Sequence, residues 1–174
     1  MAEKKSKLEA LKLALMNEEK ERGFYLEHAK RTKDELGRQM FESIAADEDV
    51  HYQKILELHK KMEERSKWPE TFSIEMVSRV TEALGRLSKE ATTSPQSDDD
   101  DVRAVKVAID FENKGEQFYA KLAEGAENKA EKRFFTLLSS MEREHRLSLE
   151  DTLEYFTEPQ EWLERKGGRH LDGA

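Results

Sequence analysis

The sequence contains no cysteine among its 174 residues, and this absence excludes several kinds of metal and redox site. Without thiols the chain can form no disulfide, no iron–sulfur cluster and no Cys-x-x-Cys metal site. Any redox centre built from these residues must therefore use oxygen and nitrogen ligands.

Helix-breaking residues are also scarce, with three prolines and eight glycines, whereas charged residues make up 39% of the chain. A composition dominated by Ala, Glu, Lys, Leu and Arg is typical of long amphipathic helices with solvated outer faces. A chain of this length can form one domain with a buried hydrophobic core. We therefore expect a single all-α domain over residues 1–174.

Basic residues are fewer than acidic ones, and the formal net charge is −8. The sequence also has no apolar run that approaches membrane-spanning length. Nucleic acids and anionic membranes both require basic patches, so neither is an expected partner. The first residues lead into an amphipathic helix and not into the apolar segment of a signal peptide. We expect a cytoplasmic protein.

The chain repeats itself without gaps at an offset of 94, the difference between positions 112 and 18. Each half is therefore one structural unit used twice. The matched residues of the first half are Ala10, Lys12, Ala14, Glu18, Lys20, Phe24, Tyr25, Ala29, Phe41, Glu48 and His51. Their counterparts are Ala104, Lys106, Ala108, Glu112, Lys114, Phe118, Tyr119, Ala123, Phe135, Glu142 and His145.

Within each half, apolar residues recur every three or four positions, which is the helical period. Repeat one (about 4–65) and repeat two (about 101–156) each predict an antiparallel helix hairpin. The four helices are expected over about 4–31, 35–65, 101–126 and 129–156.

A long crossover over about 66–100 joins the hairpins and carries an additional amphipathic helix over about 73–90. Four aspartates at 98–101, where the crossover meets the next helix, suit a helix N-cap better than a cation site. The C-terminal tail, 157–174, is expected to stop the last helix at Pro159 and to form a short turn through 161–163.

Six repeated polar residues lie within stripes that should otherwise be apolar. Four buried carboxylates would repel one another, and each would cost several kcal/mol to bury without compensation. Their charge of −4, with two neutral imidazoles, balances two divalent cations. The predicted metal ligands are Glu18, Glu48, His51, Glu112, Glu142 and His145.

The spacing supports this prediction, because the Glu and His of each Glu-x-x-His pair project from the same side of a helix. One Glu from each of two helices, with Glu-x-x-His from each of the other two, is the ligand set of carboxylate-bridged dimetal bundles. The alternative is a duplicated scaffold whose repeated charges lie at the surface.

These residues resemble the rubrerythrin-like branch of the ferritin-like proteins over nearly the whole chain. The resemblance implies a ferritin-like antiparallel four-helix bundle with two iron ions per chain. By this resemblance Glu48 and Glu142 would bridge the ions. Glu18 with His51, and Glu112 with His145, would be the terminal ligands.

Tyr25 and Tyr119 each follow a predicted ligand by one heptad. The resemblance implies that their hydroxyl groups bind ligand carboxylates and assist catalysis. The alternative for both is aromatic core packing. Asp47 either orients a histidine across the bundle or lies in solvent.

The chain departs from the family pattern at two points. Rubrerythrins carry a further Glu three residues after the first ligand of the third helix, where this sequence has Gly115, and Glu21 occupies the equivalent place in the first helix. Glu21 is therefore either an extra metal ligand or a solvated residue. The lack of cysteine also leaves no rubredoxin-like electron relay in these residues.

The resemblance predicts a di-iron oxidoreductase that reduces hydrogen peroxide with electrons from an external donor protein. The same ligands also suit a ferroxidase or iron-storage protein that uses oxygen, or a metal-stabilised interaction protein without turnover. Manganese or zinc could replace iron. Because rubrerythrin relatives are often dimers, a homodimer is a further expectation.

Overall fold

The computed structural model describes residues 2–65, 68–69, 78–80, 83, 85 and 94–168. These residues form five numbered helices and no strand, which confirms the all-α prediction. In chain order the helices are α1 (Ala2–Arg31), α2 (Glu35–Arg65), α4 (Asp99–Glu124), α5 (Lys129–Thr157) and α6 (Pro159–Gly168). None of the described helices has the length and apolar character needed to cross a membrane.

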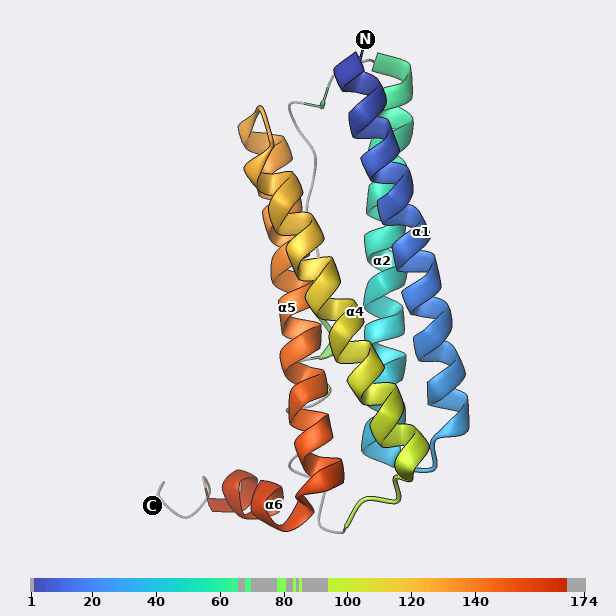
Figure 1. The fold of residues 1–174 in the computed structure, drawn as a ribbon, viewed down its shortest axis with the longest axis vertical. Coiled ribbons are helices and arrows are strands. Elements are labelled where there is room, and N and C mark those ends of the chain that lie inside the picture. Colours follow the sequence, from blue (N-terminus) through green and yellow to red (C-terminus); the bar gives the residue numbers. More distant parts are fainter. Residues whose placement is uncertain are drawn as a thin grey trace.

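Helices α1 and α2 form the first antiparallel hairpin, and α4 and α5 form the second (Figure 1). The hairpins pack together through α2 against α5 and α1 against α4. The result is an antiparallel four-helix bundle of the ferritin-like type, as predicted. The bounds of its four main helices agree closely with those that the apolar period indicates.

Short polar side chains set the ends of these helices. Asp98 caps α4 by accepting hydrogen bonds from the backbone N–H groups of Asp100 and Asp101, and the Asp101 side chain accepts from the Asp98 backbone N–H in return. This reciprocal arrangement confirms the capping prediction for the acidic run. Asn128 caps α5, since its side chain accepts a hydrogen bond from the backbone N–H of Glu131.

The described residues cover the crossover and the tail only in part. Val80, Ala83 and Gly85 are helical, whereas most of the additional helix predicted over 73–90 lies outside the described residues, as does the tail after 168. The short turn predicted at 161–163 was wrong in extent, because α6 runs for ten residues. Pro159 begins this helix at its first position, where a missing N–H costs nothing.

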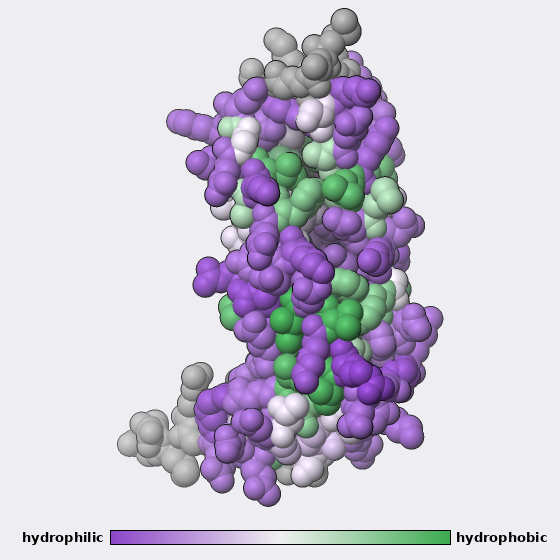
Figure 2. All heavy atoms as spheres, in the orientation of Figure 1, coloured by the Kyte–Doolittle hydropathy of each residue, from purple (hydrophilic) through white to green (hydrophobic). Residues whose placement is uncertain are grey.

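The core lies in two apolar clusters separated along the bundle. One contains Tyr25, Phe41 and Trp162, and the other contains Leu58 and Phe134. Hydrophilic side chains cover most of the face shown in Figure 2, with apolar areas between them. The middle of the bundle, between the two clusters, is where the predicted ligands lie.

Trp162 connects α6 to the bundle, since its side chain is fully buried and its ring lies 4.8 Å from that of Tyr155. Trp162→Ala should lower the free energy of unfolding by about 3–5 kcal/mol, because it leaves a large cavity. Urea unfolding followed by circular dichroism would measure this. The neighbouring exposed change Glu161→Ala is the control, and equal effects of the two changes would contradict the anchoring role.

Candidate metal centre

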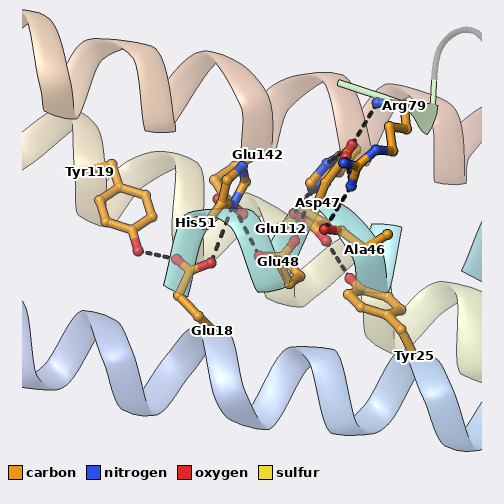
Figure 3. A network of polar contacts seen from close by, with 11 residues as sticks. Glu18, Tyr25, Ala46, Asp47, Glu48, His51, Arg79, Glu112, Tyr119 and Glu142 are labelled. Carbon is orange, nitrogen blue, oxygen red and sulfur yellow. Dashed lines mark hydrogen bonds and ion pairs between the residues drawn. The ribbon is translucent and has the colours of Figure 1, made fainter. Parts of the chain in front are cut away.

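The structure brings all six predicted ligands together at mid-bundle (Figure 3). Each of the four main helices contributes, and the two helices with Glu-x-x-His pairs contribute two residues each. None of the six side chains is more than 1% exposed. The alternative in which the repeated charges lie at the surface is therefore wrong.

The six residues form two groups that share two glutamates. One group is Glu18, Glu48, His51 and Glu142, and the other is Glu48, Glu112, Glu142 and His145. Within each group one donor atom per residue lies within 4.8 Å of all the others. The shared pair, Glu48 and Glu142, is the pair that the family resemblance implies as bridging, and that role stays a prediction.

Glu48 faces both histidines with different oxygen atoms. Its Oε2 lies 3.1 Å from Nδ1 of His51, and its Oε1 lies 3.0 Å from Nδ1 of His145. Glu18 lies 3.2 Å from Nδ1 of His51, and Glu112 lies 3.4 Å from Nδ1 of His145. Each histidine thus presents its Nδ1 atom to one outer carboxylate and to one oxygen of the shared Glu48, and Nδ1 of His51 also lies 3.4 Å from Oε1 of Glu142.

Burial and mutual repulsion control the protonation of this cluster. Burial, with the nearby charge of Glu48, raises the pKa of Glu18 to about 8 and raises that of Glu142 well above its ordinary value. Burial would raise the pKa of Glu48 too, but His51 and His145 lower it well below the ordinary range. The surrounding carboxylates raise the pKa of both histidines against the effect of burial. The cluster therefore favours added positive charge, either as protons or as cations.

Many buried polar atoms of the cluster have no hydrogen-bond partner among the described residues. Burying such atoms is costly unless something else binds them. The donor set of carboxylate oxygens and imidazole nitrogens suits iron, manganese or zinc. These residues could therefore bind metal. The atoms concerned are Glu18 Oε2, Glu48 Oε1, His51 Nε2, Glu112 Oε2, both Glu142 oxygens and His145 Nδ1.

Two buried tyrosines lie beside the outer carboxylates (Figure 3). The hydroxyl group of Tyr25 donates a hydrogen bond to Oε1 of Glu112, and that of Tyr119 donates to Oε1 of Glu18. Each bond joins the first half of the chain to the second. Burial and the neighbouring carboxylates raise the pKa of both tyrosines, so that both remain donors. Their part in catalysis stays a prediction.

Asp47, whose role the sequence left open, is buried behind His145. Its Oδ2 atom lies 3.3 Å from Nε2 of His145 and accepts a hydrogen bond of 2.8 Å from the backbone N–H of Arg79. The Arg79 side chain donates in turn to the carbonyl of Ala46. The crossover is thus connected to the cluster through one carboxylate. The repeat gave no signal for this contact, because the counterpart of Asp47 is Met141.

Glu21 is half-buried beside the cluster and belongs to neither group of donor atoms. Burial and the charges of Glu48, Glu112 and Glu18 raise its pKa to about 10. It is therefore close enough to interact with the predicted ligands. Its role as a ligand stays a prediction.

The pKa shifts predict that the metal-free protein loses stability as the pH rises from about 4.5 to 8. Because the pKa of Glu18 rises from 4.5 to about 8 on folding, the folded chain holds more protons than the unfolded chain in this range. The raised pKa values of Glu142 and both histidines act in the same direction. Thermal unfolding of chelator-treated protein across this range would measure the loss, which should be on the order of a few kcal/mol.

Glu18→Gln removes one titrating group and should flatten this pH dependence, whereas Glu19→Gln, on the exposed face of α1, should not. Added zinc(II) should stabilise the protein more at pH 8 than at pH 5, because the ion replaces bound protons. Stability that stays constant or rises between pH 4.5 and 8 in the metal-free protein would contradict the assigned electrostatics.

Comparison with known proteins agrees with this geometry. The comparisons with curated proteins and with solved structures found no significant match. The family model for rubrerythrin matches residues 9–94 and 103–169, which is most of the chain and includes all six residues of the cluster. The chain belongs to the rubrerythrin family.

Proposed function

We propose that the protein binds a pair of iron ions at this cluster and reduces hydrogen peroxide with electrons from a separate donor protein. The observation that supports it most directly is the position of Glu48. Its two oxygens face the two histidines separately, as a carboxylate that bridges two ions must do. Membership of the rubrerythrin family supports the same proposal.

The ligand set favours iron as the ion. Four carboxylates and two imidazoles provide hard oxygen donors and borderline nitrogen donors, which suit iron and manganese and also admit zinc. A pair of ferrous ions would supply together the two electrons that cleave the O–O bond of peroxide. We propose iron because zinc offers no redox change and would leave the chemistry without electrons.

The protein groups around the cluster would hold the ligands and supply hydrogen-bond donors. Tyr25 and Tyr119 keep their protons and fix the outer carboxylates of Glu112 and Glu18 through hydrogen bonds. Reduction of peroxide to two water molecules consumes two protons as well as two electrons. With the ions bound, the ligand carboxylates would carry no protons, so the two protons would have to come from water or from groups outside the ligand set.

The electrons must come from elsewhere, since the chain has no cysteine to bind an iron–sulfur or rubredoxin-type relay. We therefore propose a separate redox protein as the donor. The formal charge of −8 favours a partner with a positively charged docking face.

The test is anaerobic reconstitution with ferrous ion, followed by stopped-flow mixing with peroxide or with dissolved oxygen. We expect about two iron ions per chain, as a two-metal site requires, and a near-ultraviolet band that forms faster with peroxide than with oxygen. Faster reaction with oxygen, with release of ferric product, would favour iron oxidation and storage instead. Bound metal without any reaction would contradict an enzymatic function.

Glu142→Gln and Glu144→Gln form a matched pair on α5, one buried in the cluster and the other exposed. Glu142→Gln should lower iron content and slow the reaction with peroxide by more than about tenfold, because this residue belongs to both groups of donor atoms. Glu144→Gln should match the unmodified protein. Similar behaviour of both variants would show that iron binds elsewhere.

Tyr25→Phe removes the hydroxyl group that donates to Glu112 and should slow peroxide reduction by about 10–100-fold, the usual cost of losing a group that orients a metal ligand. Tyr119→Phe should have a similar effect through Glu18. Tyr52→Phe, on the same bundle but without such a contact to the cluster, is the control. Unchanged rates in both variants would mean that these tyrosines only fill space in the core.

A further inference from the structure

The crossover contacts the candidate metal centre through residues 78–80, where its chain turns into a helix. The backbone N–H of Arg79 donates a hydrogen bond of 2.8 Å to Oδ2 of Asp47 (Figure 3). The Arg79 carbonyl accepts from the N–H of Ala83 at 3.0 Å, so the helical turn follows this contact directly. The first N–H groups of a helix have no partner within it and favour a negatively charged acceptor. The Asp47 carboxylate provides that acceptor.

Two further contacts attach the same segment to α2 and to the core. The Arg79 guanidinium donates to the carbonyl of Ala46 at 3.0 Å, and its Nη1 atom lies 3.7 Å from Oδ1 of Asp47. The Val80 side chain is fully buried and belongs to one of the two apolar clusters. Hydrogen bonds and apolar packing therefore hold the start of the crossover helix together.

Asp47 connects this attachment to His145. Its side chain is buried, and the Oδ2 atom that accepts from Arg79 also lies 3.3 Å from Nε2 of His145. A carboxylate behind a metal-binding histidine fixes the tautomer and orientation of the ring. The Arg79 contact helps to hold this carboxylate, because a side chain that loses a partner gains other rotamers. The crossover thus helps to direct Nδ1 of His145 into the cluster.

The second histidine offers a comparison within the same molecule. The offset of 94 pairs Asp47 with Met141, so the repeat provides no carboxylate behind His51. Nε2 of His51 is buried without a hydrogen-bond partner among the described residues. An influence that passes from the crossover through Asp47 should therefore reach His145 and leave His51 unaltered.

We infer that the crossover is a working part of the metal centre: Arg79 and Val80 position Asp47 and, through it, His145, so that attachment of the crossover and binding of an ion strengthen each other. This inference rests on the proposed binding of metal at the cluster, and not on peroxide reduction. The effect is mutual because an ion that binds better to the attached state must favour that state by the same factor.

The first test measures how fast the Nε2–H protons of both histidines exchange with solvent, by NMR of the zinc(II)-loaded full chain with isotope-labelled histidine. Val80→Ala loosens the crossover without changing any charge. It should speed exchange at His145 by roughly 2–30-fold, the usual size of coupling through packed side chains, and leave His51 unaltered. Val105→Ala is the matched control, since Val105 is equally buried in the same cluster but lies on α4. Equal acceleration at both histidines, or in both variants, would overturn the inference.

The second test measures zinc(II) affinity by competition with a chelator. Asp47→Asn should weaken binding by about 10–100-fold, and Val80→Ala should weaken it by roughly 2–30-fold. When Asp47→Asn is already present, adding Val80→Ala should change the affinity by less than about twofold, because the connection to His145 is already lost. Fully additive effects would show that Val80 acts without Asp47, and would overturn the inference.

The third test follows the backbone N–H of Arg79, which reports attachment of the crossover directly. Zinc(II) added to the metal-free full chain should slow its hydrogen exchange by roughly 2–30-fold, and Asp47→Asn should abolish this slowing. The control is the N–H of Gly37, which donates to the Asp34 carboxylate at 2.8 Å at the end of the bundle. Equal slowing at both N–H groups would reflect stabilisation of the whole fold and would overturn the coupling.

The outcome for the proposed function is separate. A chain that binds zinc(II) and ferrous ion, with no response at His145 or Arg79, would overturn the coupling and leave the peroxidase proposal standing. A metal-free chain that binds neither ion would overturn both.

Discussion

The central constraint on this protein is the burial of four carboxylates in two overlapping groups of possible metal ligands. Such a cluster is stable only with compensating positive charge, whether from protons or from cations. The fold places two imidazoles among the carboxylates and raises the pKa of Glu18, His51 and His145. Protons held by these groups let the folded chain tolerate the cluster without an ion. Apolar packing on both sides along the bundle must supply the stability that the cluster costs.

The links across the cluster explain why a bundle of two hairpins keeps one geometry. Tyr25 and Tyr119 each reach from one half of the chain to a carboxylate of the other. Gly37 contributes at the end of the bundle, since a Cβ atom there would lie 2.7 Å from the ring of Phe156. These contacts fix the hairpins relative to each other and hence the separation of Glu18 from Glu112.

The main helices and the residues of the cluster could be predicted because two independent patterns agree. The apolar period gives the helix faces, and the repeat identifies the polar residues on those faces that occur twice. The contact of Asp47 with His145 could not be predicted in this way, because its counterpart is Met141 and the contact depends on how two helices far apart in sequence pack. The length of helix α6 was not predicted, because a proline such as Pro159 can end one helix or begin the next. The burial of Trp162 against the bundle explains why the chain continues as a helix.

The asymmetry of the cluster has a consequence for how charge is distributed in it. The four carboxylates Glu18, Glu48, Glu112 and Glu142 would balance two divalent ions. Asp47 is an acidic group beyond that balance, and its Oδ2 atom lies 3.3 Å from Nε2 of His145. The negative charge of Asp47 favours a cation on the side of the cluster where His145 lies. Arg79 offsets part of it, because its Nη1 atom lies 3.7 Å from the Asp47 carboxylate. A change in the crossover near Arg79 would therefore alter the electrostatic field at His145 more than at His51, without replacing any of the six predicted ligands.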